Sequence, residues 1–264
     1  LTKQDAGTWT LSGVNTYSGA TTVKAGVLTA GSNKAYGTGT ITVASGGALD
    51  LNGQTMISTG TLTLNGTGIS NGGSLMNSST TGATYAGAVT LGSNSLIGGG
   101  SGTLALTSTT LTGGNFSLTL GGASGGSLAS SLGTSLYSLT KQDSGTWTLN
   151  NASNSAYVGG ITINGGTLAA GVATSAFGAS TNAILINGGT LALGTYAETV
   201  GTVTIGANGG AITATTGILT GTSYTINNAS PATATISASL AGVGTLTKTG
   251  TGLATLSGSN TYIG

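Results

Sequence analysis

Short runs of the chain alternate between apolar and hydroxyl-bearing residues. Examples are Thr-Trp-Thr-Leu at 8–11, Thr-Ile-Thr-Val at 40–43 and Thr-Leu-Thr-Leu at 61–64. A period of two places the apolar groups on one face of an extended segment and the hydroxyl groups on the other. The pattern therefore predicts an all-β fold made of many short strands, each with one buried face.

The alternating pattern returns at a nearly fixed interval. ITINGGTLAAG begins at Ile161 and ILINGGTLALG begins at Ile184, which is a shift of 23 residues. We expect positions that share this phase to be equivalent in successive structural units and to face a common core. These positions are Leu28 and Leu49, Val43 and Leu64, and Leu168, Leu191 and Ile212.

Two architectures are compatible with such a repeat. Asn-Gly pairs between alternating runs are a hairpin signal, which favours an antiparallel meander. A unit of roughly 19–27 residues that returns to the same phase is what a parallel β-helix requires, because each coil stacks like strand on like strand. A meander has no need of a fixed period, so we predict a parallel β-helix (β-solenoid) of about 12 coils.

A longer motif occurs three times. Residues 1–11 read LTKQDAGTWTL, residues 139–149 read LTKQDSGTWTL and residues 246–256 read LTKTGTGLATL. The chain thus begins and ends on the same motif. We expect residues 1–264 to be a single β-helix segment of a longer repetitive protein.

The stretch LTKQDAGTWTLSGVNTYSGATTVKAGVLTAGS, which starts at Leu1, resembles the passenger-associated, autotransporter-type β-strand repeat. Copies lie at 1–31, 139–171 and 246–264. The resemblance implies a right-handed parallel β-helix that belongs to a bacterial secreted or cell-surface protein. The chain departs from the usual pattern at Asp5 and Asp143, where Gly is usual, and at Trp9 and Trp147, where Leu is usual.

Composition narrows the possible functions. Of 264 residues, 51 are Gly, five are basic, four are acidic, and Cys, His and Arg are absent. Zinc fingers, the common haem sites, Ser-His-Asp and Cys-His catalysis and a disulfide framework are therefore excluded. A formal net charge of +1 without Arg argues against a nucleic-acid partner. No apolar run approaches the ~20 residues of a transmembrane helix. The resemblance implies an extracellular or cell-surface location.

Two charged pairs recur in the motif. Lys3 and Asp5, like Lys141 and Asp143, are two residues apart and would share one face of a strand. We interpret them as surface pairs worth at most about 1 kcal/mol, or as charges that discourage pairing at a sheet edge. A catalytic role is disfavoured because the third copy replaces the acid with Gly250.

The remaining acids are Asp50 and Glu198, which are 148 residues apart in sequence. Polysaccharide-cleaving enzymes need two carboxyl groups within roughly 5–10 Å of each other. The spacing places several coils between these two acids, so that requirement is not met. We predict no catalytic residues, no cofactor-binding residues and no metal ligands.

The aromatic residues of the motif are interpreted as packing residues. Trp9 and Trp147 alternate with Thr and are expected in the core. Tyr17, Tyr157 and Tyr262 close the motif, and we expect them to pack at a corner while their hydroxyl groups reach water or backbone.

The sequence thus predicts a non-catalytic structural or adhesive module, a stiff stalk or fibre on a bacterial surface. Since the same motif occurs at both ends, copies are expected to stack head to tail into filaments, so that the chain is its own partner. Cell-surface glycans are a further possible partner. Thr-x-Thr rows, such as Thr40 with Thr42 and Thr61 with Thr63, raise ice binding as an alternative, alongside glycan binding. A polysaccharide-degrading enzyme is the less favoured alternative.

Overall fold

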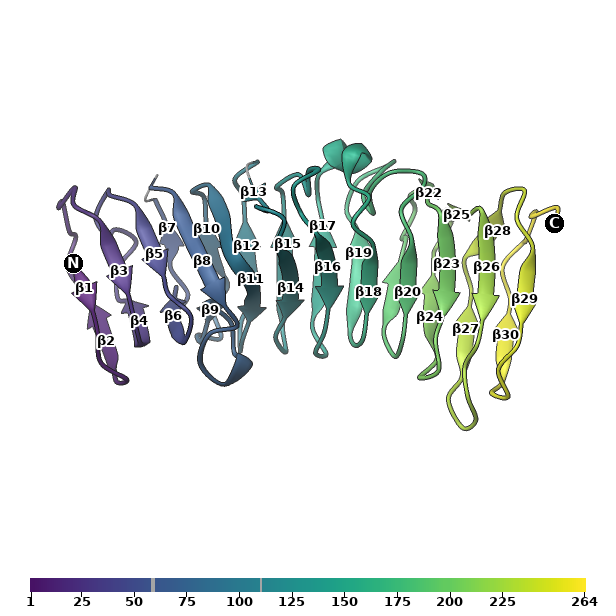
Figure 1. Cartoon of the computed structure of the whole chain (residues 1–264), viewed down its shortest axis with the longest axis horizontal. Coiled ribbons are helices and arrows are strands. Elements are labelled where there is room, and N and C mark those ends of the chain that lie inside the picture. The colour runs from purple at the N-terminus through teal and green to yellow at the C-terminus, as the bar shows by residue number, and fades with distance from the viewer. Residues whose placement is uncertain (58–59, 110) are drawn as a thin grey trace. The chain divides into compact units, whose positions relative to one another are not determined.

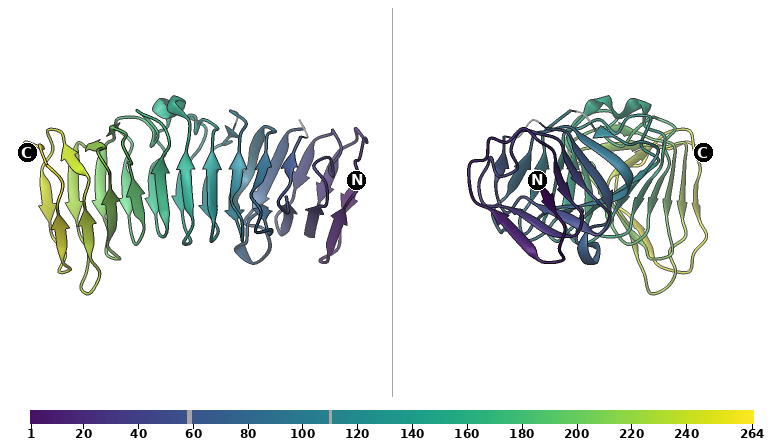
Figure 2. Two further views of the ribbon diagram at one scale, coloured as in Figure 1. Left: turned by 180° about the vertical axis from the view of Figure 1, so that it is seen from behind. Right: turned by 60° about the vertical axis from the view of Figure 1, so that its left-hand side comes forward.

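The computed structural model describes residues 1–57, 60–109 and 111–264, and Figure 1 shows their strands. These residues form two compact units. Unit 1 comprises Leu1–Ser131 with Ser135–Tyr137, and unit 2 comprises Leu132–Thr134 with Ser138–Gly264. Within each unit, short strands of consecutive coils lie side by side (Figure 2). In the described parts of the chain, helix is confined to two short 3-10 segments, η1 (Ile69–Asn71) and η2 (Ala152–Ala156).

Unit 1 is a solenoid with three rows of parallel strands. Its strands are β1 (Thr2–Lys3), β2 (Thr8–Leu11), β3 (Thr21–Val23), β4 (Gly26–Ala30), β5 (Ile41–Val43), β6 (Gly47–Asp50), β7 (Thr55–Met56), β8 (Leu62–Gly66), β9 (Leu75–Asn77), β10 (Ala83–Tyr85), β11 (Val89–Gly99), β12 (Leu104–Leu106), β13 (Leu111–Thr112), β14 (Ser117–Gly121) and β15 (Gly125–Leu128). The first row pairs β1, β3, β5, β8, β11 and β13 in that order. The second row pairs β2, β4, β6, β9, β11 and β14, and the third pairs β7, β10, β12 and β15.

Unit 2 has the same arrangement. Its strands are β16 (Ser138–Lys141), β17 (Thr146–Leu149), β18 (Ile161–Ile163), β19 (Thr167–Ala170), β20 (Ile184–Ile186), β21 (Thr190–Ala192), β22 (Glu198–Thr199), β23 (Thr202–Ile205), β24 (Gly210–Thr213), β25 (Ile218–Thr220), β26 (Ser223–Ile226), β27 (Ala234–Ile236), β28 (Ser239–Ala241), β29 (Leu246–Lys248) and β30 (Ala254–Leu256). The first row pairs β16, β18, β20, β23, β26 and β29. The second pairs β17, β19, β21, β24, β27 and β30, and the third pairs β22, β25 and β28.

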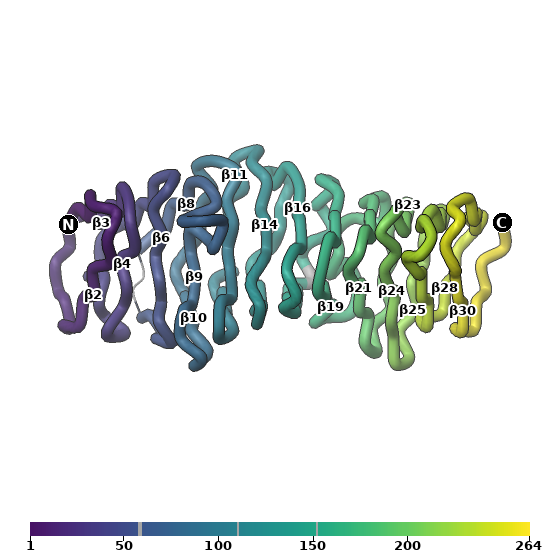
Figure 3. Tube along the Cα trace, turned by 90° about the horizontal axis from the view of Figure 1, so that it is seen from below, coloured from purple at the N-terminus to yellow at the C-terminus, as the bar shows by residue number. Residues whose placement is uncertain are grey.

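The pairings decide between the two architectures that the sequence left open. The strands pair in parallel with the equivalent strands of neighbouring coils, so the antiparallel meander is excluded. Figure 3 follows the trace through successive coils within each unit. The first rows mark six coils in each unit, which agrees with the predicted total of about 12. The fold is therefore a parallel β-solenoid, as predicted.

The core consists of apolar side chains stacked in register. In unit 1, Leu28 pairs with Leu49, and in unit 2, Leu168 pairs with Leu191. All four side chains are completely buried, as predicted from their shared phase in the sequence. Since each added coil buries a further set of such side chains at roughly 25 cal/mol per Å², the stack is stabilised coil by coil.

Candidate functional site: the repeat motif and the outer face

The lysine of the second motif copy lies inside the solenoid. Lys141 ends β16 and occupies the same inward-facing column as Ile163 of the next coil. Its side chain is fully buried, and Nζ donates to the backbone oxygens of Gln142, Asp143 and Gly165 at 2.5, 2.8 and 3.0 Å. Burial lowers the pKa of Lys141 to about 8, an effect that the nearby charge of Asp143 opposes.

Unit 1 repeats this lysine–carbonyl cluster, by which we mean the ammonium group and the backbone oxygens it contacts. Lys3 is also fully buried, and its Nζ donates to the backbone oxygens of Asp5 and Ala25. The ammonium group also lies 5.2 Å from the centre of the Trp9 ring, within the range of a cation–π interaction. In both copies one oxygen belongs to the following coil, so the lysine joins two coils.

The prediction of surface ion pairs is therefore wrong for both lysines. The period of two holds only inside a strand, and β1 and β16 end at Lys3 and Lys141. The chain turns immediately afterwards, so the lysine enters the core while Asp5 and Asp143 remain exposed. The third copy differs: Lys248 is exposed, and its Nζ donates to the backbone oxygen of Gly250 in its own coil.

A glycine in the following coil makes room for each cluster. Gly26 and Gly166 have φ angles of +70° and +59°, in the left-handed region that favours glycine. A Cβ at these positions would lie 2.6 Å from Lys3 Nζ or 2.7 Å from Lys141 Nζ. The spacing from lysine to this glycine, 23 and 25 residues, was the sequence signal for the clusters, and sequence reasoning missed it.

The two tryptophans of the motif differ in environment. Trp147 is fully buried in β17, paired with Leu168, as predicted. The prediction of a core position is wrong for Trp9, whose side chain is 40% exposed. Trp9 lies in β2, which pairs with β4 on one side, where Trp9 is opposite Leu28.

The tyrosines of the motif pack at corners. Tyr157 is fully buried, and its hydroxyl group donates to the backbone oxygen of Gly160 at 2.6 Å, which confirms the expected contact with backbone. The hydroxyl group of Tyr17 lies 2.8 Å from Oγ1 of Thr21. The ring of Tyr262 packs against that of Tyr224, with centroids 6.1 Å apart.

The two isolated acids lie in the interior, not in an open cleft. Asp50 is 3% exposed and accepts hydrogen bonds from the backbone N–H groups of Asn52 and Ser78, both at 3.0 Å, and from the Ser78 hydroxyl group at 2.6 Å. Glu198 is 1% exposed, and its Oε2 accepts from the N–H of Ala176 at 2.9 Å. Burial raises the pKa of Glu198 to about 7. Both carboxyl groups are thus enclosed by protein, which gives a polysaccharide no access to them.

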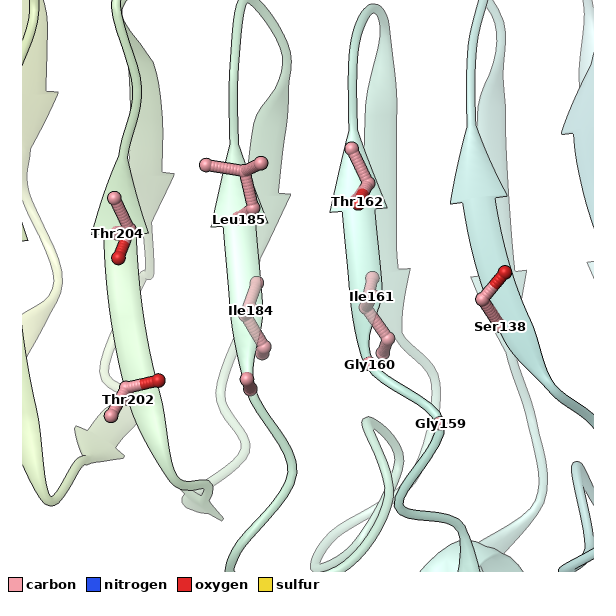
Figure 4. A pocket seen from close by; sticks show the side chains of 10 residues that line it. Ser138, Gly159, Gly160, Ile161, Thr162, Ile184, Leu185, Thr202 and Thr204 are labelled. Carbon is pink, nitrogen blue, oxygen red and sulfur yellow. The ribbon is translucent and has the colours of Figure 1, made fainter.

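The outer face of unit 2 carries a hollow of about 300 Å³ over β16, β18, β20 and β23 (Figure 4). It lies where the outward residues Gly160 and Ala183 are small, beside Leu185, which is 37% exposed. Figure 4 shows Thr162, Leu185 and Thr204 at equivalent places on neighbouring strands. Its lining has no titratable side chain, so the hollow offers contact surface but no acid–base chemistry.

The outer face of unit 1 carries an uninterrupted column of threonines. One threonine from each coil lies in register with the next: Thr2, Thr22, Thr42, Thr63, Thr90 and Thr112. Adjacent members are separated by the spacing of parallel strands, about 4.8 Å. The outward positions of the third row in the same unit are mixed, with Thr84 followed by Ala105 and Ser127. The array on the first row is therefore more regular than the sequence indicated.

Comparison with known protein families identifies the motif. The family model of the passenger-associated-transport-repeat matches residues 1–30, 139–170 and 246–264. In these three regions and in its β-solenoid fold, the chain is similar to autotransporter passengers. The matched regions contain β1, β16 and β29, and each of these strands ends at the lysine of its motif copy. Searches among curated proteins and among solved structures found no match.

Two further observations concern the part of the chain that the structure describes. Within residues 1–57, 60–109 and 111–264, no helix has the length and apolar character needed to cross a membrane. The same residues contain no group of three or more His, Cys, Asp or Glu side chains placed to hold a metal ion. The polar clusters of the repeat motif consist of a lysine ammonium group and backbone oxygens. Their hydrogen bonds link neighbouring coils.

Proposed function

We propose that the chain is a non-catalytic structural module, a β-helical stalk or fibre segment of a bacterial protein that is exported to the cell surface or secreted. The observation that carries the proposal is the occurrence of passenger-associated repeats within coils that stack in register. The repeats favour export. The enclosed carboxyl groups of Asp50 and Glu198 favour a structural over a catalytic role.

Protease treatment of intact bacteria that express the parent gene tests the location. A surface protein is digested on intact cells, whereas a protein that is digested only after lysis would contradict the proposal.

A hydrolysis screen of the purified chain on polysaccharides tests the structural role, because reproducible cleavage would contradict it. Binding to glycan arrays or to host cells tests the adhesive part of the proposal.

Head-to-tail assembly is a part of the proposed fibre role. An outermost coil has unpaired backbone groups along its strands, which another coil is able to pair. Light scattering and electron microscopy of the purified chain test this assembly over a range of concentrations. Filaments that lengthen with concentration are expected, and a strictly monomeric species would contradict assembly.

Ice binding is a second candidate, favoured by the threonine column of unit 1. The hydroxyl groups of Thr42, Thr63 and Thr90 have no bonding partner among the described residues, and each sits on a rigid, hydrogen-bonded strand. A regular array of hydroxyl and methyl groups with fixed spacing is suited to an ordered water lattice. Thermal hysteresis tests the candidate: Thr63→Tyr should abolish it, while Thr84→Tyr on the third row should retain it. Absence of hysteresis in the parent chain would exclude ice binding.

A further inference from the structure

Several asparagines of the chain are followed directly by glycine. They are Asn52, Asn65, Asn71, Asn164, Asn187 and Asn208. In such a pair the glycine nitrogen is able to attack the side-chain amide carbon of the asparagine, because glycine has no side chain to hinder the approach and its backbone turns freely. The product is a succinimide ring. Each pair is therefore a candidate for chemical modification, and the structure decides which one reacts.

Hydrogen bonds engage the glycine nitrogen in every pair except one. The N–H groups of Gly53 and Gly66 donate to side-chain oxygens of Asn77 and Ser93, at 2.8 and 2.9 Å. Backbone oxygens accept, at 2.8, 2.8 and 2.9 Å, from the N–H groups of Gly72, Gly188 and Gly209. A nitrogen held in this way has to break its hydrogen bond before it attacks, which adds to the barrier of the reaction.

The exception is Gly165. Its N–H group and the side chain of Asn164 have no hydrogen-bond partner among the described residues. The pair lies at the corner between β18 and β19, where Asn164 is exposed and Gly165 is half-buried, so water reaches both. In the next coil the equivalent Asn187 is held, because its Oδ1 accepts from the N–H of Asn208 at 3.0 Å.

The same corner belongs to the lysine–carbonyl cluster of unit 2. The backbone oxygen of Gly165 accepts from Lys141 Nζ at 3.0 Å. At the equivalent corner of unit 1, Lys24 and Ala25 take the places of the Asn-Gly pair, and the backbone oxygen of Ala25 still accepts from the lysine of that copy. The cluster therefore forms without an Asn-Gly pair, and what the pair adds at this corner is reactivity.

We propose that Asn164 is a site of spontaneous deamidation that acts on the lysine–carbonyl cluster. A bond forms between the Gly165 nitrogen and Cγ of Asn164, and the bond from Cγ to Nδ2 breaks. Nδ2 leaves as ammonia, with the proton that the Gly165 nitrogen gives up. Water then opens the succinimide at either carbonyl group, which leaves aspartate or isoaspartate at position 164.

The isoaspartate product changes the geometry of the cluster. Its main chain runs through Cβ and Cγ of the former side chain, so it is longer by a methylene group. This insertion directly precedes Gly165 and displaces the backbone oxygen that Lys141 contacts. That oxygen is the acceptor in the following coil, whereas the oxygens of Gln142 and Asp143 lie in the lysine's own coil. Deamidation therefore weakens the bond that joins the two coils.

Peptide mass spectrometry of the purified, folded chain, aged in mildly alkaline buffer, tests the site. Conversion raises the mass of a peptide by about 1 Da, because an OH group replaces an NH2 group. Asn164 is expected to convert well before the other asparagines that precede glycine, whereas in a urea-denatured sample all of them should convert at similar rates. The proposal is overturned if another pair reacts as fast as Asn164 in the folded chain, or if the lead of Asn164 persists after denaturation.

The variant Gly165→Ala separates the reaction from the cluster. The φ angle of Gly165 lies outside the left-handed region, and a Cβ there would come no closer than 3.4 Å to the nearest atom, the backbone nitrogen of Asp143. The added methyl group should slow deamidation by about tenfold or more and leave the stability of the fresh protein unchanged. Gly194→Ala, which keeps the Asn-Gly pair, is the control and should deamidate at the parent rate.

Urea denaturation of the aged samples, followed by the fluorescence of Trp147, tests the effect on the cluster. The midpoint should fall with ageing in the parent and in Gly194→Ala, and it should stay level in Gly165→Ala. A parent midpoint that is unchanged after full conversion to isoaspartate would overturn the effect on the cluster. An equal fall in Gly165→Ala would do the same, because it would place the cause elsewhere in the chain.

Discussion

Gly166 lies beside the lysine–carbonyl cluster of unit 2, and we predict that alanine at this position disrupts the cluster. A Cβ would lie 2.7 Å from Lys141 Nζ and closer still to the backbone oxygens of Asp143 and Gly145. The ammonium group would have to leave three backbone oxygens, at about 1.5 kcal/mol for each charge-assisted bond. Alanine at positive φ adds about 1 kcal/mol. Gly166→Ala should therefore lower the free energy of unfolding of unit 2 by roughly 4–6 kcal/mol.

Gly194→Ala is the matched control for this prediction. Gly194 is in the same unit and has almost the same backbone conformation, with φ of +58°, but a Cβ there would meet no atom within 4 Å. Only the backbone strain applies, so a loss of about 1 kcal/mol is expected. Urea denaturation followed by the fluorescence of the buried Trp147 measures both variants. Equal losses in the two variants would refute the reasoning, because they would mean that the cluster contributes nothing.

Five further substitutions, which make three predictions, test the same account of stability by denaturation. Lys141→Met leaves three buried oxygens without a donor and should lower the free energy of unfolding by about 2–4 kcal/mol. Lys248→Met, at the exposed third copy, should lower it by less than about 1 kcal/mol. A larger loss in Lys248→Met than in Lys141→Met would contradict the stabilising role of the cluster. Trp147→Ala should cost about 3–5 kcal/mol, and the half-exposed Trp9→Ala clearly less, so similar losses would count against their different burial. Leu191→Ala should cost about 2–5 kcal/mol because it leaves a cavity in the ladder, and a loss below 1 kcal/mol would show that the coils are loosely packed.

The coil architecture could be predicted because its signal is repeated. The shared phase of Leu28 with Leu49 and of Leu168 with Leu191 requires like residues to stack, and only a parallel arrangement does this at a fixed interval. A single repeat would not have distinguished the antiparallel meander from the parallel β-helix, since an Asn-Gly pair fits both folds. Several repeats removed that ambiguity.

The lysine–carbonyl clusters could not be predicted from the sequence in the same way. The rule that a residue two positions away shares a face fails at a strand end, and Lys141 is the last residue of β16. Lysine is almost never fully buried without partners. The partners here are backbone oxygens, which every residue has, so the sequence does not indicate where they lie. For Trp9 the pattern gave the right strand, but not the exposure of its side chain.

The register of the leucine ladders bears on how such a protein changes over time. Because each coil contacts only its neighbours, duplication or loss of one whole coil leaves every remaining junction chemically alike. Gain or loss of one residue within a strand instead turns the buried side chains of that strand toward water, since a shift of one residue exchanges the two faces. Genes of this kind should therefore gain and lose segments of about 22 codons, each of which encodes one whole coil. Insertions and deletions of other lengths should be tolerated only at the corners between strands.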